Sequence, residues 1–277
     1  MKDGITPLTL WRYSDVGHTQ DARKETKELF DDQAFFDYPK PVSLINRILR
    51  LSTTENDLIL DFFSGSSTTA HAVMQLNAED GGNRKYIMVQ LPEVCDEKSE
   101  AYKAGYKTIA DIGKERIRRA ANKIKLEKPD YQGDLGFKVF KLDSSNFKIW
   151  NSGLNSEAEY HKQLDLHVEK IKSNGSREDI LYEIILSLGL PLSIGIAIIE
   201  LGDKQVFSLQ EGKLLICLED KITEELIEST AELNPDRVIF LDQAFQGRDL
   251  LKINALHYFK NYRTYNNQSK EIEFITI

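Results

Sequence analysis

Apolar side chains recur at helical spacing in the first third of the chain. In residues 42–52, VSLINRILRLS, the apolar positions fall on one helical face, and Pro41 stands where a first turn tolerates proline. Residues 15–30, DVGHTQDARKETKELF, have mixed charges at helical spacing and predict an exposed helix after a loop. We therefore expect loops and helices to precede the first strand.

Short apolar runs of strand length alternate with helical stretches between residues 58 and 128. LILDFF (58–63) precedes a helix over STTAHAVMQLNAE, and YIMVQLP (86–92) follows the glycine turn EDGGNRK. A helix over 99–128 comes next, with a break expected near Gly105 or Gly113. Buried strands in this order are typical of a parallel α/β sheet, although two strands do not make a stable sheet alone.

The stretch EKPDYQGDLGF (127–137) marks the expected boundary between a first domain, 1–130, and a second, 131–277. Beyond it, FKVFKLD (137–143) alternates like a strand, and helices are expected over 157–172 and 177–188. The strands IGIAIIEL, KQVFSL, KLLICLED, RVIFLD and EIEFITI, with helices over 221–233 and 247–260, predict a second α/β unit.

Composition indicates a folded protein of the cytoplasm. The 277 residues suit about two domains, with 41% hydrophobic and 29% charged side chains. No apolar run approaches the ~20 residues of a membrane helix, and the first residues do not resemble a signal peptide. Cys95 and Cys217 lie far apart without metal-ligand spacing, so we expect no metal site and two buried thiols.

Charge is uneven along the chain. A formal net charge of -8 argues against coating nucleic acid by bulk charge. Residues 113–128, GKERIRRAANKIKLEK, nevertheless carry seven Lys or Arg against two Glu. This run is either a solvated helix face or a surface that contacts phosphates.

Residues 61–73, DFFSGSSTTAHAV, carry the candidate chemistry. A glycine turn between a strand and a helix leaves backbone N–H groups at the helix start, where an anion is favoured. A turn capped by Ser or Thr explains the same residues equally well. The run lacks the lysine of a phosphate-binding P-loop and two glycines of the dinucleotide fingerprint. A nucleoside-like cofactor without phosphate remains, and S-adenosylmethionine fits that description.

Together with FFDYPKPVSL before it and YIMVQLPE after it, this run closely resembles the modification subunit of type III restriction-modification systems, a family of β-class adenine-N6 DNA methyltransferases. VGHTQDARKE, ERIRRA, LGFKVFKLDSSNFKIW, LYEIILSLGLPL and RVIFLDQAF resemble other stretches of these subunits. The resemblance implies a partial Rossmann-like S-adenosylmethionine-dependent methyltransferase sheet followed by a C-terminal α/β domain. DNA and the restriction subunit are the implied partners, in a homo-oligomer without membrane contact.

The resemblance also implies the cofactor-binding residues. The methionine end would be lined by Asp61, Phe62, Gly65, Ser66, Thr68 and Thr69, and Pro39 and Lys40 would close the pocket from the other side. Gln90 stands where many relatives present an acid to the ribose, so the contact is weakened or shifted to Glu93. Ser67 replaces the second glycine of the commoner loop, which costs energy if that position needs a positive φ.

One family segment is absent from the 277 residues. The seven prolines are never adjacent, so no form of the family's catalytic Asp-Pro-Pro-Tyr segment, which holds a flipped adenine, exists here. The resemblance therefore predicts a truncated, C-terminal portion with no catalytic residue of its own and no activity alone. A non-catalytic assembly module, which pairs subunits or contacts the restriction subunit, is the alternative; a small-molecule binding protein is a third class.

Overall fold

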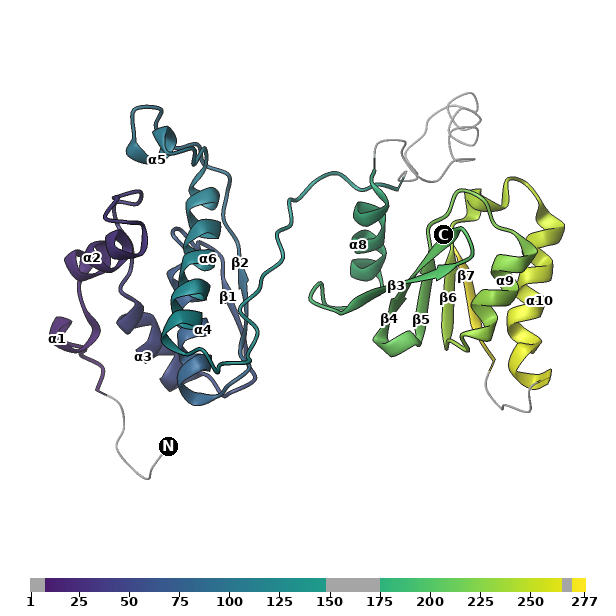
Figure 1. Cartoon of the computed structure of the whole chain (residues 1–277), viewed down its shortest axis with the longest axis horizontal. Coiled ribbons are helices and arrows are strands. Elements are labelled where there is room, and N and C mark those ends of the chain that lie inside the picture. Colours follow the sequence, from purple (N-terminus) through teal and green to yellow (C-terminus); the bar gives the residue numbers. More distant parts are fainter. Residues whose placement is uncertain (1–7, 148–174, 266–270) are drawn as a thin grey trace, which may run out of the picture. The chain divides into compact units, whose positions relative to one another are not determined.

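The computed structural model describes residues 8–147, 175–265 and 271–277, which form two compact units, Met1–Phe137 and Lys138–Ile277. Each unit has its own sheet (Figure 1). The predicted helix over 157–172 lies outside the described residues, as does Trp150. Within the described ranges no helix is long and apolar enough to cross a membrane.

The first unit contains six helices and two strands in its described part: α1 (Tyr13–Val16), α2 (Thr19–Leu29), α3 (Val42–Ser52), β1 (Leu58–Asp61), α4 (Thr68–Asp80), β2 (Lys85–Met88), α5 (Glu100–Lys103) and α6 (Ile109–Glu127). Its helices begin and end where the sequence provides caps. His18 and Asp21 form a capping box at α2, and Thr108 and Asp111 form another at α6. The expected break after α5 occurs at Gly105, whose φ is +100°. Gly113 instead lies buried inside α6.

The two strands are parallel, with Leu60 paired to Ile87, and one of their faces is covered by helices. On the covered face, Ile59 and Tyr86 pack against buried residues of α3 and α4, and α6 completes the layer. On the opposite face Leu58, Leu60 and Ile87 are exposed, Leu60 to 49%. The prediction that both strands are buried is therefore wrong for this face, because the described residues of the unit provide helices on one side only.

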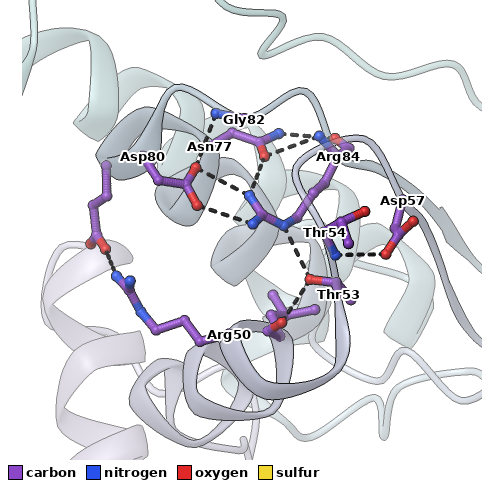
Figure 2. Close-up of polar contacts among 10 residues, drawn as sticks. Arg50, Thr53, Thr54, Asp57, Asn77, Asp80, Gly82 and Arg84 are labelled. Atoms are coloured by element: carbon purple, nitrogen blue, oxygen red, sulfur yellow. Dashed lines mark hydrogen bonds and ion pairs between the residues drawn. The ribbon is translucent and has the colours of Figure 1, made fainter. Parts of the chain in front are cut away.

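A buried arginine joins the amino ends of the strands to the ends of two helices (Figure 2). Arg84 pairs with Asp80 of α4 at 3.0 Å and donates through Nε to Thr53, the residue that ends α3, at 3.1 Å. Asn77 exchanges hydrogen bonds with the Arg84 backbone, at 2.9 and 3.1 Å. This polar cluster fixes α3 and α4 against the start of β2, opposite the strand ends that carry the candidate site.

The stretch 137–143, predicted as a strand, is not one. It forms no ladder with another strand in the described structure, and Figure 1 shows it as an extended connection. Its apolar residues make separate contacts: Phe137 packs in the first unit, whereas Phe140 meets Tyr182 edge to face at 4.9 Å. Val139 and Leu142 are exposed. Alternation without a neighbouring strand leaves the backbone unpaired, so the pattern does not produce a strand here.

The second unit is a five-stranded mixed sheet with helices. Its described elements are α8 (Arg177–Ser187), β3 (Ile196–Leu201), β4 (Lys204–Leu209), η1 (Gln210–Gly212), β5 (Leu214–Cys217), α9 (Glu224–Glu232), β6 (Arg237–Phe240), η2 (Asp242–Phe245), α10 (Asp249–Tyr265) and β7 (Glu273–Thr276). The strand order is β3-β4-β5-β6-β7; the first two pairings are antiparallel and the last two parallel. KQVFSL and KLLICLED, which the spacer QEG predicts to form a hairpin, are thus confirmed as the antiparallel pair β4 and β5. Cys217 is buried in the core, whereas Cys95 of the first unit is half-buried.

The core of the second unit is separate from that of the first. Buried residues of α8, all strands from β4 to β6, α9 and α10 form one hydrophobic cluster, with Phe240 and Phe259 at its centre in an edge-to-face contact of 5.9 Å. β3 is an edge strand that leaves Ile198 exposed. Both units are therefore mixed α/β, as the sequence predicts.

Candidate functional site

The candidate site is the glycine loop, residues 61–69, which connects the end of β1 to the start of α4. Because β1 and β2 are parallel, their carboxyl ends share one edge of the sheet, the edge where α/β proteins bind ligands. Val89 N donates to Asp61 O at 2.8 Å, and Ser64 N donates to Val89 O at 3.1 Å. These bonds hold the start of the loop beside the end of β2.

The carboxylate of Asp61 organises the loop from within. Thr69 Oγ1 donates to Oδ2 at 2.6 Å, and the backbone N–H of Phe63 donates to Oδ1 at 3.1 Å. The end of β1 is thereby tied to the first turn of α4. Since a carboxylate offers about four lone-pair positions, Asp61 keeps capacity for a further donor. Phe62 and Phe63, the two residues after Asp61, are exposed.

Gly65 is needed at its position for two reasons. Its φ is +50°, and a Cβ there would lie 3.3 Å from Cζ of Phe36, so the aromatic ring closely approaches the loop backbone. The N–H of Gly65 donates to Oε1 of Gln90 at 2.8 Å. Gln90 therefore braces the loop in this structure, and its contact with a ribose stays a prediction. The pattern of residues did not identify Phe36, although it lies in the quoted FFDYPKP.

Ser67 has the positive φ that the sequence analysis considered for this position of the loop. Its φ is 60° and its ψ is 38°, so a residue with a side chain is strained here. As the N-cap of α4, Ser67 makes no side-chain capping bond to any described residue. The loop therefore differs from a turn closed by its own serine cap, and the first N–H groups of α4 are left for another partner. Beneath the loop, Gly113 leaves room for Ser67: a Cβ at 113 would lie 2.5 Å from Ser67 Oγ.

A buried arginine from α6 supports the hydroxyl groups of the loop. Arg116 is 0% exposed, and its Nη1 donates to Ser66 Oγ at 2.8 Å and to Thr68 Oγ1 at 2.9 Å. Burial lowers the pKa of Arg116 to about 10, so the guanidinium is still charged at neutral pH. Its Nε is buried without a hydrogen-bond partner in the described structure, as is Nδ1 of nearby His71. The sequence analysis did not identify Arg116, because it treated all cationic residues of 113–128 as lying on one exposed surface.

The remaining predicted residues are only partly gathered around the loop. Pro39 is buried, whereas Lys40 and Glu93 are exposed. Ser66 and Thr68 are buried, and Asp61 and Thr69 are half-buried. The structure thus brings together the loop residues and Gln90; the roles of Pro39, Lys40 and Glu93 stay predictions.

Most cationic side chains of the basic run at 113–128 are ion-paired or buried. Carboxylates lie 2.6–3.8 Å from four of its cationic side chains, Lys114, Arg118, Arg119 and Lys123. Arg116 is buried in the loop support. The ion-paired face favours the interpretation of a solvated helix over that of a phosphate-binding surface. Contact between this helix and DNA stays a prediction.

Comparison with known proteins bears on the same residues. Residues 1–133 match the family model described as DNA methylase. The chain is 43% identical over 130 residues, 47% of its length, to the Mod subunit of the type III restriction-modification enzyme StyLTI of Salmonella typhimurium. It is 39% identical over 144 residues, 52% of its length, to the Mod subunit of EcoPI of Escherichia phage P1. The likeness to the Mod subunit of EcoP15I of Escherichia coli is 28% over 268 residues, 92% of the chain.

The chain spans a fifth to two fifths of the length of these relatives, namely 20%, 22% and 38%. The two more similar relatives match about half of the chain, whereas the third matches nearly all of it. Residues 1–133 therefore belong to the DNA methylase family, and the chain is a relative of the modification subunits of type III restriction-modification enzymes.

Proposed function

We propose that this chain supplies the S-adenosylmethionine-binding part of an adenine-N6 DNA methyltransferase in a type III restriction-modification system. The observation that carries the proposal is the glycine loop. It lies at the carboxyl ends of the parallel strands and leads into α4, a 13-residue helix. The side chain of the N-cap residue, Ser67, makes no capping hydrogen bond to this helix. Such a helix start favours the carboxylate of an amino acid. The partial Rossmann-like character of the sheet belongs to the same proposal.

Each predicted residue has a proposed part in holding the cofactor. Asp61 and the turn at Gly65 would receive the methionine end, with the ammonium attracted to the carboxylate. Gln90 or Glu93 would meet the ribose hydroxyls. The other proposed contacts are Phe62, Ser66, Thr68 and Thr69 on the loop side and Pro39 and Lys40 on the opposite side. S-adenosylmethionine, when bound, supplies the methyl group.

The adenine half of the site would come from another segment. Chemistry at an adenine amino group requires the base to be flipped from the duplex and held by polar groups and an aromatic side chain. The 277 residues contain no adjacent prolines and hence no Asp-Pro-Pro-Tyr segment. We propose that these residues by themselves do not methylate DNA, and that in the complete assembly DNA is the substrate and the restriction subunit a partner.

The proposal is tested by measuring transfer of a labelled methyl group to duplex DNA. The purified chain is assayed alone and together with a polypeptide that carries the Asp-Pro-Pro-Tyr segment and the target-recognition region of a type III modification subunit. We expect no transfer by the chain alone and transfer by the mixture, abolished when Asp61→Ala is introduced. Turnover by the chain alone would refute the division of the site.

An assembly role for residues 138–277 is the second candidate. The observation that favours it is a core independent of the first unit, with an edge strand, β3, that exposes Ile198. This unit would pair subunits in a homo-oligomer or contact the restriction subunit. Light scattering tests the pairing: dimers of the intact chain that dissociate with Ile198→Lys would support it, and a monomer at all concentrations would contradict it.

A further inference from the structure

Arg116 is a buried charge without a counter-charge in the described structure. Its side chain is 0% exposed, and no described carboxylate lies within the 4.0 Å of an ion pair. Glu25 acts on it only at longer range, and Oε2 of Glu25 accepts a hydrogen bond from Val42 N at 3.2 Å. His71, which burial and the charge of Arg116 keep neutral, supplies no counter-charge. Burying an unpaired cation is costly, so the position is explained best if an anion joins it.

Because the hydroxyl oxygens of Ser66 and Thr68 accept hydrogen bonds from Arg116, their protons remain to be donated. Both Ser66 Oγ and Thr68 Oγ1 accept from Arg116 Nη1, and the two oxygens lie 3.4 Å apart. Each hydroxyl has one proton, and the hydrogen bond between the two hydroxyl oxygens uses only one of these two protons. The second finds no acceptor among the hydrogen bonds of the described residues. The cluster therefore presents at least one hydroxyl donor that is polarised by a cation.

The same place is the start of α4. Ser66 precedes the N-cap and Thr68 is the first residue of the helix, whose N-terminus carries partial positive charge. Three independent features thus meet here: an unneutralised guanidinium, a hydroxyl proton without an acceptor, and the uncapped N–H groups of a helix. All three favour an anionic oxygen, and a neutral ligand would use only the second and third.

We propose that Arg116 is a positioning residue for a carboxylate bound at the glycine loop, which acts through the hydroxyls of Ser66 and Thr68. The inference rests on the proposed function, in which that carboxylate belongs to the amino-acid end of S-adenosylmethionine. Arg116 does not touch the ligand, because its side chain is fully buried. It fixes the direction of the hydroxyl donors and adds positive potential behind them.

The test compares two ligands that differ only in the carboxylate: S-adenosylmethionine and decarboxylated S-adenosylmethionine. Their dissociation constants are measured by NMR titration of the full chain, for the wild type and for Arg116→Met, Arg116→Lys and Ser66→Ala. We expect the wild type to prefer the carboxylate ligand roughly ten-fold, the gain of one charge-assisted hydrogen bond. The preference should fall to near one in Arg116→Met and be partly kept in Arg116→Lys.

Arg84→Met is the matched control, since Arg84 is also a buried arginine beside α4 but lies at the opposite ends of the strands (Figure 2). It should leave the ligand preference unchanged. Equal weakening of both ligands in Arg116→Met would refute the role of Arg116 while the cofactor site stands. If Arg116→Met does not fold, the inference is tested with Ser66→Ala. An unchanged ratio of the two dissociation constants in Ser66→Ala would refute the inference. No binding of either ligand by the wild type at millimolar concentration would overturn the proposed function and the inference with it.

Discussion

Ser67 and Gly113 are predicted to be energetically coupled across the loop and α6. Ser67 is held in the left-handed region, which costs a residue with a side chain about 1–2 kcal/mol. Ser67→Gly removes this strain but gives the unfolded chain more freedom, so the net gain should be about 0.5–1 kcal/mol. The unfolding free energy of the first unit should rise by that amount.

Gly113→Ala has two opposing effects. Alanine inside a helix is favoured over glycine by about 1 kcal/mol. A Cβ at 113, however, would lie 2.5 Å from Ser67 Oγ and 3.2 Å from the backbone oxygen of Gly65, and such overpacking costs about 1–3 kcal/mol. We expect a net loss of about 1 kcal/mol in the wild type. In Ser67→Gly the closer contact is gone, and the same change should be neutral or stabilising, an interaction energy of about 1–2 kcal/mol.

Urea unfolding followed by tryptophan fluorescence measures these values. The chain has two tryptophans, so Trp150→Phe leaves Trp11, which lies 5.3 Å from the guanidinium of Arg47 on α3 and reports on the first unit. Asp32→Gly is the matched control: Asp32 also has a positive φ, of 64°, but lies away from Gly113. If Gly113→Ala costs the same in the Ser67→Gly and Asp32→Gly backgrounds, the proposed contact between loop and helix is refuted.

Three further results are expected. The exposed apolar face of β1 and β2 should cause self-association, so Leu60→Glu should reduce light scattering and dye binding at unchanged helix content; equal scattering would contradict this. Burial, followed by the charges of Arg116 and Lys123, lowers the pKa of His71 from about 6.5 to about 3, so His71 is neutral when folded. Above pH 6.5 this group therefore does not lower the free energy of unfolding. As the pH falls from 6.5 toward 3, the free energy of unfolding should decrease by about 1.4 kcal/mol per pH unit. This slope should disappear in His71→Leu, and an unchanged slope would exclude His71 as its cause. Arg84→Met should cost about 1–3 kcal/mol in urea unfolding, because it removes the donor groups that bind Thr53, Asn77 and Asp80, whereas a loss of less than about 0.5 kcal/mol would show that the cluster in Figure 2 is not structural.

Local patterns predicted much of the secondary structure. The apolar spacing of residues 42–52 gave α3 with its observed bounds, and the glycine turn at 79–85 ended α4 at Gly81, whose φ is +76°. Pro41 precedes α3 as its N-cap instead of standing in its first turn, a shift of one residue. The helix expected over 99–128 is interrupted at Gly105, one of the two positions expected for a break, because Gly105 adopts a positive φ and Gly113 does not.

Local patterns do not predict which segments far apart in the sequence pair or pack together. The alternation at 137–143 is that of a strand, yet no described strand pairs with it. The sequence of residues 113–128 likewise shows seven cationic side chains without indicating which one is buried. Arg116 is recognised only when α6 is packed against the loop, where its guanidinium reaches Ser66 and Thr68. The loop itself was predictable, because strand, glycine and helix follow within one short segment.

Direct mapping of cofactor binding tests the central claim. Backbone amide shifts of the isotope-labelled chain would be recorded during titration with S-adenosylmethionine to millimolar concentration. The account predicts saturable shifts concentrated in residues 61–69 and at Gln90, with loss of binding in Asp61→Ala. No saturable shifts, or shifts confined to residues 175–277, would contradict the claim that the glycine loop is the cofactor site.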